Sequence, residues 1–244
     1  MLAPSEVAAR CVEPGEGRRR FLSDLAWRDF YAHFLWHEPR AARASLRPSL
    51  ERVAWEQDPR VDAWRTGRTG FPVVDAAMRQ LTTSGWMHNR ARMIAGSFLT
   101  KHLGVDWRVG EQHFMEHPID GDPASNNGGW QWAASTGTDP QPWFRIFNPT
   151  LQAIGHDPEG AYVRRWLPEL AGLAGEAVYA PPPGACVIPI VDHREARARA
   201  LTVYRDDDED PHDASMGTRP GTGRSRPRSR PVARVGGDPR RSRS

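Results

Sequence analysis

The stretch DGDPASNNGGWQWAAS, residues 120–135, combines carboxylate and amide side chains with two tryptophans that one residue separates. Turn residues lead into it, and residues 122–135 are predicted to form a helix. Helical positions two apart point roughly 200° away from each other, at about 100° per residue. Trp130 and Trp132 therefore cannot fill the same apolar face, and one of the two indoles is predicted to point in another direction.

One face of this predicted helix carries a ladder of residues spaced four apart. Asp122, Asn126 and Trp130 line two polar groups and one indole along it. Gly128 and Gly129 lie inside the same helix, where each glycine costs roughly 1 kcal/mol against alanine. Two interpretations of the glycines stay open: another group approaches this backbone closely, or the packing there is loose.

Outside this stretch, apolar residues recur at helical intervals, and proline, glycine and polar turns separate the segments. No alternating strand pattern of useful length occurs. The sequence therefore predicts an all-α fold. Helices are expected over residues 18–37, 58–65, 72–84, 88–103, 106–117, 122–135, 157–167 and 191–205.

Length and composition narrow the class of protein. A chain of 244 residues can bury a substantial core. Its two cysteines, Cys11 and Cys186, exclude a disulfide framework, a four-cysteine zinc site and an iron–sulfur cluster built from this chain alone. The N-terminus lacks the apolar core of a signal peptide, and no run of 18 apolar residues occurs. We therefore expect a cytoplasmic protein with no membrane partner.

The charge is unevenly distributed along the chain. Residues 211–244 contain nine arginines and two aspartates, and residues 206–210 are all acidic. Residues 1–205 are almost balanced, with 24 basic and 23 acidic side chains. The basic excess therefore belongs to the end of the chain and is no evidence for a basic nucleic-acid-binding domain. Residues 1–205 are predicted to form one domain, and residues 206–244 a disordered tail.

Two histidine pairs, His33/His37 and His113/His117, have the spacing of four residues that can bind zinc on a helix. The metalloprotease order places glutamate directly after the first histidine, and neither pair has it. Further ligands are also missing from the pattern. No metal site is predicted.

Two further predicted helix faces mix polar groups with aromatic or sulfur neighbours. Salt bridging at the surface explains Asp24 and Arg28 about as well as function does. It does not explain the repeated mixture, which is what stacking on a base combined with recognition of its edge requires. The two sets are Asp24, Trp27, Arg28 and Tyr31, and then Asn89, Arg92 and Met93.

Several long motifs occur together in one order: WRDFY (27–31), TGFPVVDAAMRQL (69–81), GWMHNRARM (85–93), DGDPASNNGGWQWAASTGTD (120–139), RIFNP (145–149) and YVRRWLPEL (162–170). Between about residues 4 and 204 the chain resembles the flavin-binding helical domain of the photolyase/cryptochrome family. The subtype most resembles class I cyclobutane pyrimidine dimer photolyases. Relatives that repair (6-4) lesions typically carry a His-His pair where this chain has His88-Asn89, and cryptochromes often replace Asn126 by Asp or Cys.

The resemblance implies a carbon–carbon lyase that repairs pyrimidine dimers in DNA under blue light, by electron transfer from reduced FAD. A monomer is expected. The residues that match flavin contacts are Phe21, Arg28, Asn89, Arg92, Asp120, Gly121, Asp122 and Asn126. Those that match the electron-conducting tryptophans are Trp130, Trp107 and Trp55.

The resemblance also assigns residues to the DNA substrate. Those that match contacts to the flipped dimer are Asp24, Trp27, Asn89, Met93 and Trp132. Those placed near the DNA are Asp24, Trp27, Arg28, Tyr31, Asn89, Arg90, Trp132 and Arg145.

Some features depart from the family pattern. The resemblance begins inside the helical domain, so the antenna chromophore domain and the segment that holds the FAD phosphates are expected to be absent from this chain. Asp24 stands where glutamate is usual. Two alternatives therefore remain: a truncated remnant without activity, and a cryptochrome-like flavoprotein that does not repair DNA. Asn126 and the complete lesion-contacting set argue against the cryptochrome-like alternative.

Overall fold

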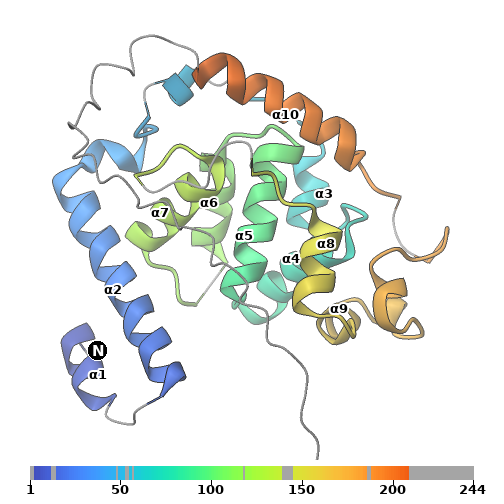
Figure 1. The fold of residues 1–244 in the computed structure, drawn as a ribbon, viewed down its shortest axis with the longest axis horizontal. Coiled ribbons are helices and arrows are strands. Elements are labelled where there is room, and N and C mark those ends of the chain that lie inside the picture. Colours follow the sequence, from blue (N-terminus) through green and yellow to red (C-terminus); the bar gives the residue numbers. More distant parts are fainter. Residues whose placement is uncertain are drawn as a thin grey trace, which may run out of the picture. The chain divides into compact units, whose positions relative to one another are not determined.

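The computed structural model describes residues 3–11, 15–47, 49–52, 55–56, 58–117, 119–138, 145–185 and 188–208. The chain divides into two compact units, residues 1–211 and 212–244, and the second lies outside the described residues. The described part is helical and contains no strand, which confirms the predicted all-α class (Figure 1). The predicted disordered tail lies outside the described residues except for residues 206–208.

Ten α-helices occur in the described part of the chain. They are α1 (Pro4–Arg10), α2 (Glu16–His37), α3 (Val61–Arg65), α4 (Pro72–Ser84), α5 (Asn89–Ser97), α6 (Trp107–Glu116), α7 (Pro123–Ala134), α8 (Pro149–His156), α9 (Ala161–Trp166) and α10 (His193–Asp208). Short 3₁₀ turns cover Pro39–Ala42, Ser49–Arg52, Pro168–Leu170 and Gly175–Val178. The sequence analysis missed α1 and α8, and α10 continues three residues past the predicted domain boundary.

The core centres on α4 and α5. Helix α4 begins at Pro72, which needs no amide partner at that position, and ends at Gly85 in the left-handed conformation. The predicted helix over residues 88–103 changes to a π-helical turn at Phe98–His102. All five residues of that turn are buried. Helix α10 packs across the turn (Figure 1). Arg199 of α10 donates to the carbonyl oxygen of His102 at 2.6 Å.

Helix α2 packs against α7, and one of the contacts between them is especially close. A Cβ at Gly128 would lie 2.2 Å from two ring carbons of Tyr31, so no larger residue fits there without a shift. The close-approach interpretation of Gly128 is therefore confirmed, whereas a Cβ at Gly129 would meet nothing within 4 Å. None of the α2 residues is buried, and Phe21 and Trp27 are each 44% exposed.

Two amide side chains of α7 hold the segment that follows α2. Asn127 Nδ2 and Gln131 Nε2 both donate to the carbonyl oxygen of Ala41, at 3.1 and 2.8 Å. Gln131 Oε1 accepts from the backbone N–H of Leu46 at 3.3 Å. Buried backbone groups need such partners, so these bonds fix where the chain leaves α2 relative to α7.

The two adjacent glycines of α7 should respond in opposite ways to alanine. Gly128→Ala should lower the free energy of unfolding, because overpacking against Tyr31 costs about 1–3 kcal/mol and exceeds the helix-propensity gain of about 1 kcal/mol. Gly129→Ala faces open space and should raise the stability by up to about 1 kcal/mol. Urea unfolding followed by far-UV circular dichroism measures both changes. Equal effects of the two substitutions would contradict the Tyr31 contact.

Candidate functional site

Two ion pairs join α5 and α2 to the segment before α7. Arg92 of α5 donates to both carboxylate oxygens of Asp120, at 2.9 and 2.8 Å. Arg28 of α2 lies 3.3 Å from the carboxylate of Asp122. All four side chains are partly exposed, so each pair contributes only about 0–1 kcal/mol to stability. The pairs orient these groups at one end of α7 more than they stabilise the fold.

Local chemistry explains why α7 starts where it does. Asp122 is the N-cap, and its carboxylate accepts the backbone N–H of Ser125 at 2.8 Å. Pro123 follows at the first helical position, where its missing N–H costs nothing. Arg92 is fixed from its other side, because its Nε donates to the carbonyl oxygen of Met87 at 2.8 Å. Asp122 is thus held by Arg28 and by its own capping bond, and Asp120 by an arginine that is itself fixed to the backbone.

Helix α6 positions the amides of α7. Asn126 Nδ2 donates to the carbonyl oxygen of Glu111 at 2.9 Å, and Asn127 Nδ2 donates to the Glu111 carboxylate at 2.8 Å. Burial raises the pKa of Glu111, and the Asn127 hydrogen bond only partly offsets this. Glu111 was not among the predicted site residues, although the sequence showed its partners Asn126 and Asn127 in a segment rich in hydrogen-bonding groups.

The residues matched to the lesion lie on α2, α5 and α7. Asp24 and Asn89 are exposed, and Trp27 packs edge-on against Phe30 with ring centroids 5.6 Å apart. Asn89 Nδ2 lies 4.0 Å from the Met93 sulfur. Among the described residues no ring contact joins Trp27 to Trp132 (whose indole instead faces Phe147 at 6.5 Å). The structure thus pairs Asn89 with Met93 and leaves the two indoles apart.

The hollow between α2 and α7 is small. Its volume is about 10 Å³, and its lining includes Tyr31, Gly128 and Trp132. That space holds about one water molecule, whereas ligand pockets typically occupy about 300–1,000 Å³. Neither a flavin ring nor a pyrimidine dimer fits this hollow in the described arrangement of α2 and α7.

The three tryptophans matched to electron transfer lie deeper in the protein. Trp130 is 4% exposed, Trp107 is fully buried and Trp55 is half-buried. A Cβ at Gly110 would lie 2.1 Å from the Trp130 ring, so this glycine makes room for the indole. Trp132 remains half-buried, which confirms that the two indoles of α7 face different surroundings. Within the described residues the indole N–H groups of Trp55 and Trp107 have no hydrogen-bond partner.

Trp64 is a further aromatic neighbour that the sequence analysis did not single out. It is fully buried, its Nε1 donates to the carbonyl oxygen of Ala95 at 3.1 Å, and its ring centroid lies 6.0 Å from that of Trp130. It lies on α3, a helix of five residues that is too short to show a periodic pattern.

The remaining predicted site residues lie at the surface. Phe21 is on the exposed face of α2, and Gly121 is exposed between the two aspartates. Arg90 is half-buried at the start of α5, and Arg145 is exposed before α8. The structure therefore places most residues matched to flavin and DNA on α2, α5 and α7 or just before α7, at exposed or half-buried positions, whereas Trp130 and Trp107 are buried.

Comparison with known proteins decides the family. A family model described as the FAD binding domain of DNA photolyase matches residues 21–206. The chain belongs to this family. It is 50% identical over 196 residues to the deoxyribodipyrimidine photo-lyase of Escherichia coli, and 50% identical over 212 residues to that of Neurospora crassa. These alignments cover 75% and 78% of this chain but only 41% and 34% of the relatives, so the chain spans less than half of their length.

Solved structures agree with the family assignment. A bacterial class III photolyase from Agrobacterium tumefaciens is 39% identical with a TM-score of 0.82, covering 86% of this chain and 48% of its own. A cryptochrome from Synechocystis is 30% identical with a TM-score of 0.76, covering 83% of this chain and 46% of its own. Across the described residues no helix has the length and apolar character needed to cross a membrane.

Replacing the half-buried Glu111 should change how the stability of the fold depends on pH. Its pKa is raised in the folded protein, so folding favours the protonated form, and stability is lost as pH rises from the unfolded pKa through the folded one. Glu111→Gln should therefore be more stable relative to the parent at neutral pH than at acidic pH. Thermal unfolding across this range measures the difference. Glu176→Gln, at an exposed carboxylate, is the control, and an identical pH profile in both variants would refute the prediction.

Proposed function

We propose that this chain is the flavin-binding part of a class I cyclobutane pyrimidine dimer photolyase, which uses blue light and reduced FAD to repair DNA. The observation that carries the proposal is the arrangement around the start of α7. Arg92 orients Asp120 there, and Arg28 orients Asp122. The backbone of Glu111 accepts a hydrogen bond from Asn126. Trp130 lies buried about one turn after Asn126 on the same helix.

The donor set suits the polar edge of a flavin. Its ring and ribityl chain present both hydrogen-bond donors and acceptors, which the carboxylates of Asp120 and Asp122, the amide of Asn126 and the guanidinium of Arg92 complement. A Cβ at Gly129 would meet nothing within 4 Å, so the backbone is open on that side of α7. These residues would hold the cofactor. Entry of its ring requires more room than the 10 Å³ between α2 and α7.

When bound, reduced FAD would supply the excited-state electron that opens the cyclobutane bonds of the dimer and would recover it afterwards. The protein contributes orientation and the exclusion of water. Trp27 and Trp132 offer flat apolar surfaces for stacking a flipped pyrimidine dimer. Asn89 and Met93, 4.0 Å apart, offer an amide and a polarisable sulfur to its edge. Asp24 is exposed on α2 and reaches one methylene less far than glutamate would.

The alternatives differ in what the chain does under light. A cryptochrome-like flavoprotein would bind FAD and undergo photoreduction without repairing a dimer. An inactive remnant would bind no FAD. Incubating the chain with excess FAD, a reductant and a dimer-containing oligonucleotide under blue light separates the three possibilities. Light-dependent loss of dimers, measured by chromatography of the digested oligonucleotide, supports the proposal, and bound flavin without repair contradicts it.

Two exposed tryptophans of α2 should differ in their effect on lesion binding. Trp27→Ala should weaken binding to a dimer-containing oligonucleotide roughly 5- to 150-fold, because stacking contributes about 1–3 kcal/mol per base. Trp36, which is 82% exposed on the same helix, is the matched control, and Trp36→Ala should leave the affinity unchanged. Fluorescence anisotropy with damaged and undamaged oligonucleotides measures both. Equal losses in the two variants would count against a stacking role for Trp27.

Photoreduction of added flavin should depend on the buried indole. Trp130→Phe removes the oxidisable ring and keeps an apolar side chain against Phe114, whose ring centroid lies 5.0 Å from it. We expect slower bleaching of oxidised flavin under blue light, with DNA affinity in the dark nearly unchanged. Unaltered bleaching in Trp130→Phe would show that electrons reach the flavin by another path.

A further inference from the structure

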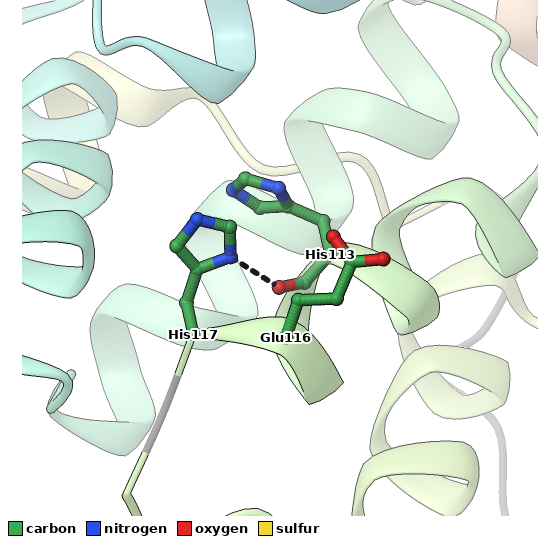
Figure 2. Close-up of side chains that lie close together, drawn as sticks. All are labelled: His113, Glu116 and His117. Carbon is green, nitrogen blue, oxygen red and sulfur yellow. Dashed lines mark hydrogen bonds between the residues drawn. The ribbon is translucent and has the colours of Figure 1, made fainter.

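The end of α6 holds a cluster of side chains that the proposed repair function does not use. One possible ligand atom from each of His113, Glu116 and His117 lies within 4.8 Å of the others (Figure 2). The two imidazole ring centroids are 4.2 Å apart with the planes inclined by 40°. Positions three and four apart share one face of a helix, which is why the backbone brings these three groups together.

The cluster contains an unsatisfied polar atom. His113 is only 7% exposed, and within the described part of the chain its buried Nε2 has no hydrogen-bond partner. A buried polar group without a partner is destabilising and calls for an explanation, such as a bound water or ion. A cation bound by this nitrogen would remove the deficit.

The ring of His117 is already oriented by a hydrogen bond. Its Nδ1 lies 2.9 Å from the backbone carbonyl oxygen of His113 (Figure 2). Because a carbonyl oxygen can only accept, the proton is on Nδ1 of His117. In the neutral ring this leaves the Nε2 lone pair of His117 available to a ligand. Metal-binding histidines commonly have their other nitrogen held by such a hydrogen bond. The cluster therefore has this feature before any ion binds.

We propose that His113, Glu116 and His117 bind a divalent transition-metal ion of the zinc type, with the remaining position open to water. Two imidazoles and one carboxylate form a known donor set for such ions. Ligand atoms about 2.1 Å from a tetrahedral ion lie roughly 3.4 Å apart, so the cluster contracts by side-chain rotation on binding. Glu116 is exposed and free of the core, so it can make that movement.

This set is not a metalloprotease centre, because no glutamate directly follows the first histidine. The structure shows a different set, in which the glutamate is itself close enough to be a ligand.

Cobalt titration of the chelator-treated full chain tests the site, because four-coordinate Co²⁺ has characteristic visible absorption bands. We expect one equivalent to bind and to be displaced by Zn²⁺. His117→Ala should weaken Co²⁺ binding more than about 100-fold, and Glu116→Gln should weaken it about tenfold. Even changes outside the metal's direct ligands cost about 10–100-fold in affinity. Both positions lie outside the core, so these variants fold even if a change at the buried His113 does not.

The chain provides its own control. His33 and His37 form a second pair with the same spacing on α2, and both are exposed. The double variant His33→Ala/His37→Ala should bind Co²⁺ as the parent does. Loss of binding in this variant with retention in His117→Ala would reduce the effect to adventitious surface binding and overturn the proposal, as would absence of saturable binding in the parent. Neither flavin nor DNA is needed, so the result is independent of the photolyase proposal.

Discussion

The described fold depends on how closely aromatic rings approach the backbone of two helices. Gly128 of α7 admits the ring of Tyr31 from α2, and Gly110 of α6 admits the ring of Trp130 from α7; a Cβ at these positions would lie 2.2 and 2.1 Å from the rings. Overpacking such contacts costs about 1–3 kcal/mol, a large part of a typical domain's stability. These two contacts set the spacing of α2, α7 and α6, and therefore where their polar residues meet.

The chemistry of the site follows from that spacing. With α7 fixed between α2 and α6, Asp122 reaches Arg28, and Asn126 reaches the backbone of Glu111. The ion pairs are too exposed to hold the fold, so they act as orienting contacts that a ligand's polar groups can replace. The hollow between α2 and α7 has a volume of about 10 Å³, which is far smaller than a typical ligand pocket.

Sequence reasoning predicted what depends on local pattern. Pro72 and Gly85 bound α4 as predicted, because both residues act through their own backbone. Periodicity also separated Trp130 from Trp132. The π-helical turn at Phe98–His102 was not predicted, because one turn with shifted backbone hydrogen bonds leaves the helical pattern of apolar residues unchanged. Hydrogen-bond partners distant in sequence could not be predicted either. Glu111 accepts hydrogen bonds from amide side chains 15 and 16 residues away. The assigned roles of the site residues remain predictions.

The central claim is that the start of α7, held by α2, α5 and α6, is a flavin site. Equilibrium titration of FAD fluorescence with the full chain tests it most directly, with Asn126→Leu as the variant and circular dichroism as the check on folding. We expect saturable binding of one equivalent that is weak enough for FAD to separate on gel filtration and that is lost in Asn126→Leu. Absence of saturable binding, or equal binding by a folded Asn126→Leu variant, would contradict it.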